Sequence, residues 1–404
     1  MSNFAFGTYR ISDLNPQHIE ALKEAIDSGI TMIDTSSNYM DGGAERAIAL
    51  AFRSHEDKID KVEIVSKYGY IQGQNLLDIK ENSLDEVVEY SDECYHSISK
   101  LYLHLQLTQS LKRLERNHID CYLIHNPEYY ILDAIKRGMD RDDILDEMYR
   151  RIENAFVGLE EEIKGGRIGS YGISSNSFSI SHQSEEFLPY EDLITLAQNA
   201  ALVVGNEKHS FTTIEMPINM LEIQGLECAK WAKENGLRVL SNRPLNAQFE
   251  DKMFRLADYD ESSEYYHHFN ELMEVCSNDM LRPLSNLLEQ LDKSKHKFGW
   301  IGDYDGFLYS QIIPHISKTL ELVDEENRVT MFNFIDLYLI EYRKMVLYES
   351  SKSTKVQLKE FFAYCTKTMQ ECALEFLMQS DSIDYILVGM RKPTYVHQIL
   401  ALEK

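Results

Sequence analysis

The chain has 404 residues, 44% of them hydrophobic, and a formal net charge of −25. This length suits one large α/β domain or two ordinary ones. Nucleic acid and anionic membranes call for clustered Lys and Arg, which this acidic chain lacks, so we expect neither as a partner.

The cysteines are scattered, with no CxxC pair and no zinc-like Cys/His spacing. They are Cys94, Cys121, Cys228, Cys276, Cys365 and Cys372. This pattern predicts reduced thiols and no metal site. We see no charged-then-apolar leader and no run of about 18 apolar residues, and therefore expect a cytoplasmic protein. The sequence carries no signal for an oligomeric state.

Short β-branched runs alternate with helical patterns through the first 245 residues, as in a parallel sheet with helical crossovers. The runs predict strands near 4–9, 30–34, 62–66, 119–124, 168–173, 212–217 and 237–241, with an eighth at 385–389. Helices are expected at 16–28, 44–53, 101–117, 147–165, 185–200, 222–235, 365–379 and 393–402. Eight strand–helix units predict an α/β fold, the (β/α)8 or TIM barrel.

Three long segments lie between a predicted strand and the next helix, at 70–100, 128–146 and 248–364. The last has aromatic residues at helical spacings and no convincing strand, so we expect a helical insertion between the seventh and eighth strands. The chain would then be a single barrel domain over 1–404 that contains this insertion. Loops that follow barrel strands rim the catalytic face, so we expect the insertion to shape a substrate pocket.

Ionisable side chains stand at or just beyond the ends of three consecutive predicted strands. They are Asp34, Tyr39, Lys67 and His125. Because the carboxyl ends of barrel strands converge on one mouth, we expect these four side chains to meet there.

This group suits proton donation to a carbonyl. An ammonium at Lys67 would lower the pKa of the Tyr39 phenol toward the working pH, and Asp34 would hold the ammonium in place. His125 would point a ring nitrogen at the carbonyl oxygen. No side chain supplies a hydride, so a nicotinamide cofactor is implied, although no GxGxxG follows a strand.

Each of these residues also has an ordinary structural explanation. An Asp at a strand end is more often a turn or helix cap, and a lone Lys is usually solvated. A single His or Tyr in such a place more often packs or hydrogen-bonds within the fold. The combination of four complementary groups at successive strand ends favours the catalytic interpretation.

Five segments resemble the aldo-keto reductase family, in the order in which that family carries them. They are GITMIDTSSNYMDGGAE, SLKRLERNHIDCYLIHNP, GLEEEIKGGRIGSYGISSNSF, SNRPLNA and YILVGMRKPTYV. The resemblance covers about 1–245 and 365–404 and leaves 248–364 outside it. It implies that Tyr39 is the general acid, that Lys67 and Asp34 tune it, and that His125 orients the carbonyl.

The resemblance also implies residues that hold an NAD(P)(H) cofactor. They are Ser174, Asn176, Glu215, Arg243, Pro244, Leu245, Gly389, Met390, Arg391 and Lys392. Asn176 lies one residue later than in the commonest form of the family, and Glu215 replaces a glutamine. A carboxylate there would favour the oxidised, cationic nicotinamide unless it is protonated. Arg391 and Lys392 suit a 2′-phosphate, so we expect NADP(H) rather than NAD(H).

We therefore expect an aldo-keto reductase-type oxidoreductase that reduces an aldehyde or ketone, for example a sugar, or performs the reverse reaction. The alternative is a nicotinamide-nucleotide-binding regulatory or scaffold subunit with little catalysis. Glu215 and the long insertion favour that alternative mildly, whereas the intact group of four opposes it. A third interpretation, a metal-dependent hydrolase barrel, is opposed by the absence of an H-x-H strand motif from the sequence.

Overall fold

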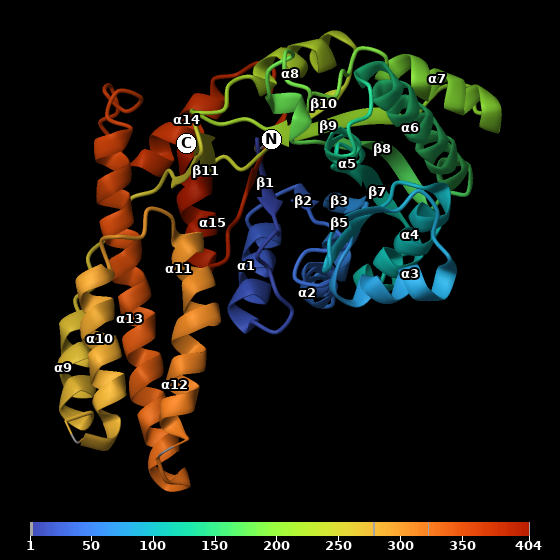
Figure 1. Cartoon of the computed structure of the whole chain (residues 1–404). Coiled ribbons are helices and arrows are strands. Elements are labelled where there is room, and N and C mark those ends of the chain that lie inside the picture. The colour runs from blue at the N-terminus through green and yellow to red at the C-terminus, as the bar shows by residue number, and fades with distance from the viewer. Residues whose placement is uncertain (1–2, 278, 322, 404) are drawn as a thin grey trace. The chain divides into compact units, whose positions relative to one another are not determined.

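A computed structural model describes residues 3–277, 279–321 and 323–403. Eight parallel strands close into a barrel and follow one another around it in chain order, which confirms the predicted (β/α)8 fold (Figure 1). The barrel strands are β1 Phe4–Gly7, β2 Met32–Asp34, β3 Glu63–Tyr68, β7 Ile119–His125, β8 Ile168–Ser174, β9 Phe211–Pro217, β10 Arg238–Asn242 and β13 Tyr385–Val388.

The strand register brings polar residues to one end of the barrel. Asp34 pairs with Val65, His125 with Ser174, and Ser174 with Glu215. Below this polar end, an apolar layer fills the barrel. Its buried members are Ala5, Met32, Val65, Cys121, Leu123, Leu240 and Leu387. The barrel is thus a packed core whose polar groups gather where the strands end.

Helices follow the strands as predicted, with one clear exception. The helices are α1 Pro16–Asp27, α2 Gly43–Phe52, α4 Lys100–Leu114, α6 Arg141–Lys164, α7 Leu193–Val204, α8 Gly225–Glu234, α14 Met369–Met378 and α15 Pro393–Leu400. The prediction of a helix from 185 is wrong, because α7 begins only at Leu193. Pro189 disfavours helical backbone at Leu188, and Arg141 binds the carbonyls of Glu185 and Phe187.

The two shorter acidic segments are folded. Residues 70–100 form the antiparallel sheet β4–β6–β5 and helix α3. Their bounds are β4 Tyr70–Ile71, α3 Leu76–Asn82, β5 Val88–Ser91 and β6 Cys94–His96. Residues 128–146 contain α5 Tyr129–Lys136 and the first turns of α6.

The chain divides into two compact units, residues 1–244 with 375–404 and residues 245–374. The second unit contains α9, α10, α11, α12 and the long α13 (Figure 1). Their bounds are α9 Tyr265–Val275, α10 Arg282–Ser294, α11 Ile301–Phe307, α12 Ile313–Leu320 and α13 Glu325–Gln357. Its own core includes the fully buried tyrosines Tyr265, Tyr304, Tyr338 and Tyr342.

The prediction that 248–364 contains no strand is wrong. A hairpin of β11 Asn246–Phe249 and β12 Lys252–Arg255 opens the second unit. Its strands are four residues long and lack β-branched residues, so they carry no strand signal in the sequence. The turn between them places Glu250 at a φ of 53°, in the left-handed region.

The prediction of six reduced cysteines is wrong for one pair. Cys365 and Cys372 form a disulfide, with their Cα atoms 6.1 Å apart. They stand seven positions apart in the sequence, a spacing that the CxxC and zinc patterns do not cover. The other four cysteines are free and buried. Within the described part of the chain, every helix is too short or too polar to span a bilayer.

Candidate active site

A buried ion cluster joins three strands at the polar end of the barrel. Lys67 of β3 is fully buried and donates a hydrogen bond to Asp34 Oδ2 of β2. Its ammonium also donates to the backbone oxygen of Thr35 at 3.1 Å. Glu215 of β9 brings Oε2 to within 3.2 Å of the same Lys67 Nζ. One ammonium therefore faces two carboxylates.

Burial and charge set the pKa values in this cluster. Burial and the neighbouring Glu215 raise the pKa of Asp34 well above its usual range, more than Lys67 lowers it. Burial alone would lower the pKa of Lys67, but Asp34 and Glu215 outweigh it and raise that pKa. Lys67 is therefore a fixed cation, and the site carries more acidic than basic groups.

Tyr39 is placed beside the ammonium by the turn that follows β2. Ser37 N–H donates to the Lys67 carbonyl oxygen at 3.2 Å, which fastens this turn to β3. Lys67 Nζ lies 5.3 Å from the centroid of the Tyr39 ring, and the His125 ring meets Tyr39 edge-on at 5.9 Å. The turn continues into α2 through Gly42, whose φ of 75° suits glycine.

The predicted lowering of the Tyr39 pKa is wrong. Burial raises the pKa of this phenol above its usual value, and Asp34 and Glu215 oppose the lowering effect of Lys67. The effect of the ammonium can be anticipated from the sequence, whereas burial and the position of Glu215 depend on the fold. Tyr39 is consequently a neutral phenol at pH 7, which suits a proton donor better than a base.

His125 is held through one ring nitrogen. Its Nδ1 lies 3.1 Å from Ser36 Oγ, and its backbone oxygen accepts from His96 Nε2 at 2.7 Å. Burial, Lys67 and His96 together lower the pKa of His125 well below its usual value, so the ring is neutral. With Nδ1 engaged, Nε2 is the nitrogen that can meet a substrate oxygen.

A chain of hydrogen bonds leads from His125 into the 70–100 segment. Ser36 Oγ donates to Asn38 Oδ1 at 2.7 Å, and Asn38 Nδ2 donates to Gln72 Oε1 at 3.2 Å. Gln72 Nε2 then donates to Cys94 Sγ at 3.1 Å. We call Ser36, Asn38, Gln72 and Cys94 the histidine relay. Sequence reasoning missed it because its members lie in the turn after β2, in a loop and at the start of β6, without a recognisable pattern.

The residues expected to hold a nicotinamide carboxamide lie around the same end. Ser174 is buried at the end of β8, while Asn176 is exposed. Glu128 shapes the loop after β8, since it accepts from Ser175 Oγ at 2.7 Å and from Asn176 N–H at 3.0 Å. Burial raises the pKa of Glu128 to about 6.

Two buried acceptors at this end fit an amide ligand. Asn242 Nδ2 donates to Glu215 Oε1 at 2.9 Å. Among the described residues, Asn242 Oδ1 receives no hydrogen bond, and Glu215 Oε2 is engaged by the ion pair with Lys67 at 3.2 Å. A carboxamide NH2 group offers two donors, which such acceptors can take. Asn242 was not predicted, although it directly precedes the Arg-Pro-Leu stretch.

Arg243, which was expected to contact a pyrophosphate, forms an ion pair with a neighbouring carboxylate. Arg243 donates to Glu222 Oε1 at 2.6 Å, and its backbone has a φ of 53°. Pro244 follows it, and the buried Leu245 already belongs to the second unit. The positive charge that the sequence assigned to phosphate at Arg243 is thus largely neutralised by Glu222.

The stretch expected to hold the adenosine phosphate precedes α15. Gly389 is exposed, Met390 is buried, and Lys392 is the residue before Pro393, where the helix begins. Arg391 lies near His18 and lowers its pKa together with burial, the larger cause. A helix start flanked by two cations favours an anion.

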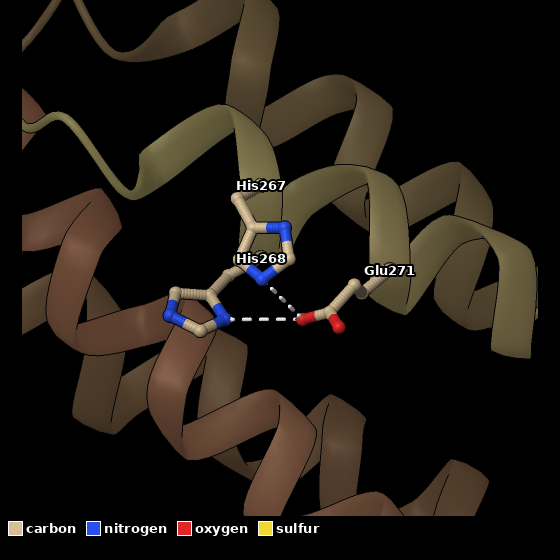
Figure 2. Close-up of side chains that lie close together, drawn as sticks. All are labelled: His267, His268 and Glu271. Carbon is tan, nitrogen blue, oxygen red and sulfur yellow. Dashed lines mark ion pairs between the residues drawn. The ribbon is translucent and has the colours of Figure 1, made fainter.

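The described residues also include one group with metal-binding side chains, which lies in the second unit (Figure 2). His267 Nε2 and His268 Nδ1 of α9 each lie 3.4 Å from Glu271 Oε2. Such contacts are ordinary between helix neighbours three and four residues apart, so we assign the group no role.

A closed eight-stranded barrel with lysine, tyrosine, histidine and carboxylate groups at one end defines a (β/α)8 protein equipped for acid–base chemistry. The model of the Aldo/keto reductase family matches residues 3–404, and the chain belongs to that family.

Several known proteins are similar to this chain. Aldo-keto reductase YhdN of Bacillus subtilis is 30% identical over 223 residues, 55% of this chain and 50% of that protein. The 6-dehydroglucose reductase of Agrobacterium fabrum is 27% identical over 149 residues, 36% of this chain and 46% of that protein. The chain thus spans about half the length of these relatives. The holo structure of aldo-keto reductase AKR11C1 from Bacillus halodurans aligns with a TM-score of 0.49 at 15% identity, covering 100% of this chain and 87% of that one.

Proposed function

We propose that the protein is an NAD(P)(H)-dependent aldo-keto reductase that interconverts a small aldehyde or ketone and its alcohol. The observation that carries this proposal is the buried Lys67 at the barrel end, held by Asp34 and facing the ring of Tyr39, which the His125 ring meets edge-on. The name of the Agrobacterium relative keeps a sugar carbonyl among the candidate substrates.

In this proposal a bound nicotinamide supplies the hydride to the carbonyl carbon. Tyr39 gives its proton to the carbonyl oxygen, so that an alcohol results and a phenolate is left. Lys67 stabilises that phenolate, and Asp34 holds Lys67 in place. His125 orients the substrate oxygen through Nε2, which accepts from an alcohol hydroxyl when Nδ1 carries the proton and donates to a carbonyl when Nε2 carries it.

We propose NADP(H) rather than NAD(H) as the cofactor. Ser174, Asn242 and Glu215 would hold the carboxamide, and the buried Asn242 Oδ1, which receives no hydrogen bond among the described residues, supports this. Arg391 and Lys392 before α15 would hold the phosphate end. Arg243 contributes less to this preference than the sequence implied, because Glu222 pairs with it.

We also propose one barrel domain in which 248–364 is an insertion, and a cytoplasmic location. Four free, buried cysteines agree with a reducing compartment, whereas the disulfide does not.

A Tyr39→Phe variant tests the catalytic proposal. Turnover of an aldehyde and sugar panel, followed by nicotinamide absorbance, should fall by about 10²–10⁴, the usual contribution of a general acid. Nucleotide affinity should stay within a few-fold of the wild type, because the ring itself is kept. Unchanged turnover in the variant would refute the role of Tyr39.

The second candidate is a nucleotide-binding regulatory subunit. The excess of carboxylates over cations beside a phenol of raised pKa favours it, because such a site disfavours phenolate. Tight nucleotide binding without turnover on the whole panel would establish this alternative.

A further inference from the structure

Glu215 and Asp34 approach Lys67 from opposite sides of the barrel. In the order of strands around the barrel, β9 and β2 stand four places apart in a ring of eight, and β3 adjoins β2. Glu215 therefore reaches across the interior to bring Oε2 within 3.2 Å of Lys67 Nζ. A carboxylate that is 1% exposed needs such a partner, because little water is left to solvate it.

We propose that Glu215 is a positioning residue of the active centre, which holds Lys67 from across the barrel and supplies the negative charge that selects the oxidised nicotinamide. The inference rests on the proposed function, since it requires that the barrel binds a nicotinamide nucleotide. The family resemblance implies a contact to the carboxamide, where a carboxylate favours the oxidised ring; the hold on Lys67 from across the barrel goes beyond it.

The charges that face this cluster support the inference. Tyr39 and His125 are neutral near pH 7, because the phenol pKa is raised and the imidazole pKa is lowered. Farther out, burial lowers the pKa of His96 to about 4, and Tyr9 meets Tyr39 edge-on at 5.2 Å. Lys67 is thus the cation against the two carboxylates, and with both ionised the group has a net charge of −1.

This excess charge acts differently on the two forms of the cofactor. The oxidised nicotinamide ring is a cation and neutralises the cluster, whereas the reduced ring is uncharged. When no cationic nicotinamide ring is bound, a proton on Asp34 or Glu215 can neutralise the cluster, in line with the raised pKa of Asp34. Binding of the oxidised form should therefore expel that proton, and binding of the reduced form should not.

Calorimetric titration of the full-length protein with NADP⁺ and NADPH tests the inference. Glu215→Gln should lower the preference for NADP⁺, expressed as the ratio of the two dissociation constants, roughly tenfold or more, as removal of a nearby buried charge implies. Glu207→Gln is the matched control, because it removes the same charge from an exposed position before β9 and should leave the ratio unchanged.

A second measurement uses the wild type alone and decides the matter if Glu215→Gln does not fold. Titrations in two buffers of different ionisation enthalpy should show proton release with NADP⁺ and none with NADPH. An unchanged ratio in a folded Glu215→Gln protein, or equal proton release with both nucleotides, overturns the inference and leaves the proposed function intact. Failure of the wild type to bind either nucleotide overturns both.

Discussion

Ser36 and His125 show how a single hydroxyl can set the chemistry of a catalytic imidazole. In the observed direction of the histidine relay, Ser36 donates to Asn38 and must accept from His125 Nδ1–H. The neutral ring then has a lone pair on Nε2, which accepts a hydrogen bond from an alcohol. With the relay reversed, Nε2 would carry the proton and donate to a carbonyl.

We expect Ser36→Ala to change this tautomer balance. Nitrogen-15 NMR of the imidazole should report a protonated Nδ1 in the wild type and a larger share of protonated Nε2 in the variant. Alcohol oxidation should slow roughly two- to tenfold, the effect of one hydrogen bond of about 0.5–1.5 kcal/mol. Ser37→Ala is the control, because Ser37 Oγ is buried without a hydrogen-bond partner among the described residues. Identical imidazole shifts in the two variants would contradict the relay.

At the scale of elements, the sheet β4–β6–β5 supports the active centre through β6. His96 of β6 donates to the His125 backbone at 2.7 Å and stacks on Tyr129 with ring centroids 5.2 Å apart. Burial lowers the pKa of His96 to about 4 from 6.5. The folded state therefore favours a neutral imidazole at this position.

This preference predicts a dependence of stability on pH. The contribution of His96 is fully present above pH 6.5, its unfolded pKa, and is lost as the pH falls toward 4. At pH 5 the loss should reach about 2 kcal/mol in the free energy of unfolding. Urea denaturation at pH 7.5 and pH 5 should show this loss in the wild type. His96→Gln, which keeps a donor but cannot titrate, should lose about 2 kcal/mol less over the same interval; an equal loss in both proteins would argue against His96.

The sequence predicts the strands that belong to the strand–helix alternation and misses the short strands outside it. The alternation of strand and helix patterns predicts all eight barrel strands. Because the strand ends converge on one mouth, the group of Asp34, Tyr39, Lys67 and His125 is then expected there. The hairpin β11–β12 and the strand β4 have two to four residues per strand and lie outside that alternation, which located the equally short β1, β2 and β13.

Interactions across the barrel are also invisible in the sequence. The contact between Glu215 and Lys67 depends on which strands stand opposite each other, and the family pattern assigned Glu215 to the cofactor alone. The raised pKa of Tyr39 depends on burial, which outweighs the effect of a single neighbouring charge that sequence reasoning could anticipate.

At the scale of the whole molecule, the barrel is closed by a strand that the chain reaches only after the second unit. β13 pairs with β1 on one side and β10 on the other. The segment that leads back from α13 to α14 contains Tyr364, which is 99% exposed. A cut there would separate β13 covalently from the other seven barrel strands while leaving its hydrogen bonds in place.

We therefore expect brief chymotrypsin treatment to cleave first after Tyr364, because cleavage needs an exposed aromatic residue in an accessible backbone. The nicked protein should migrate as one species in a native gel, since β13 remains paired in the closed barrel, and should separate into two fragments under denaturing conditions. Tyr364→Ser should slow this first cut. Separation of the nicked fragments in the native gel would mean that strand pairing and helix packing alone do not hold the last barrel strand, and that closure depends on the covalent connection through the second unit.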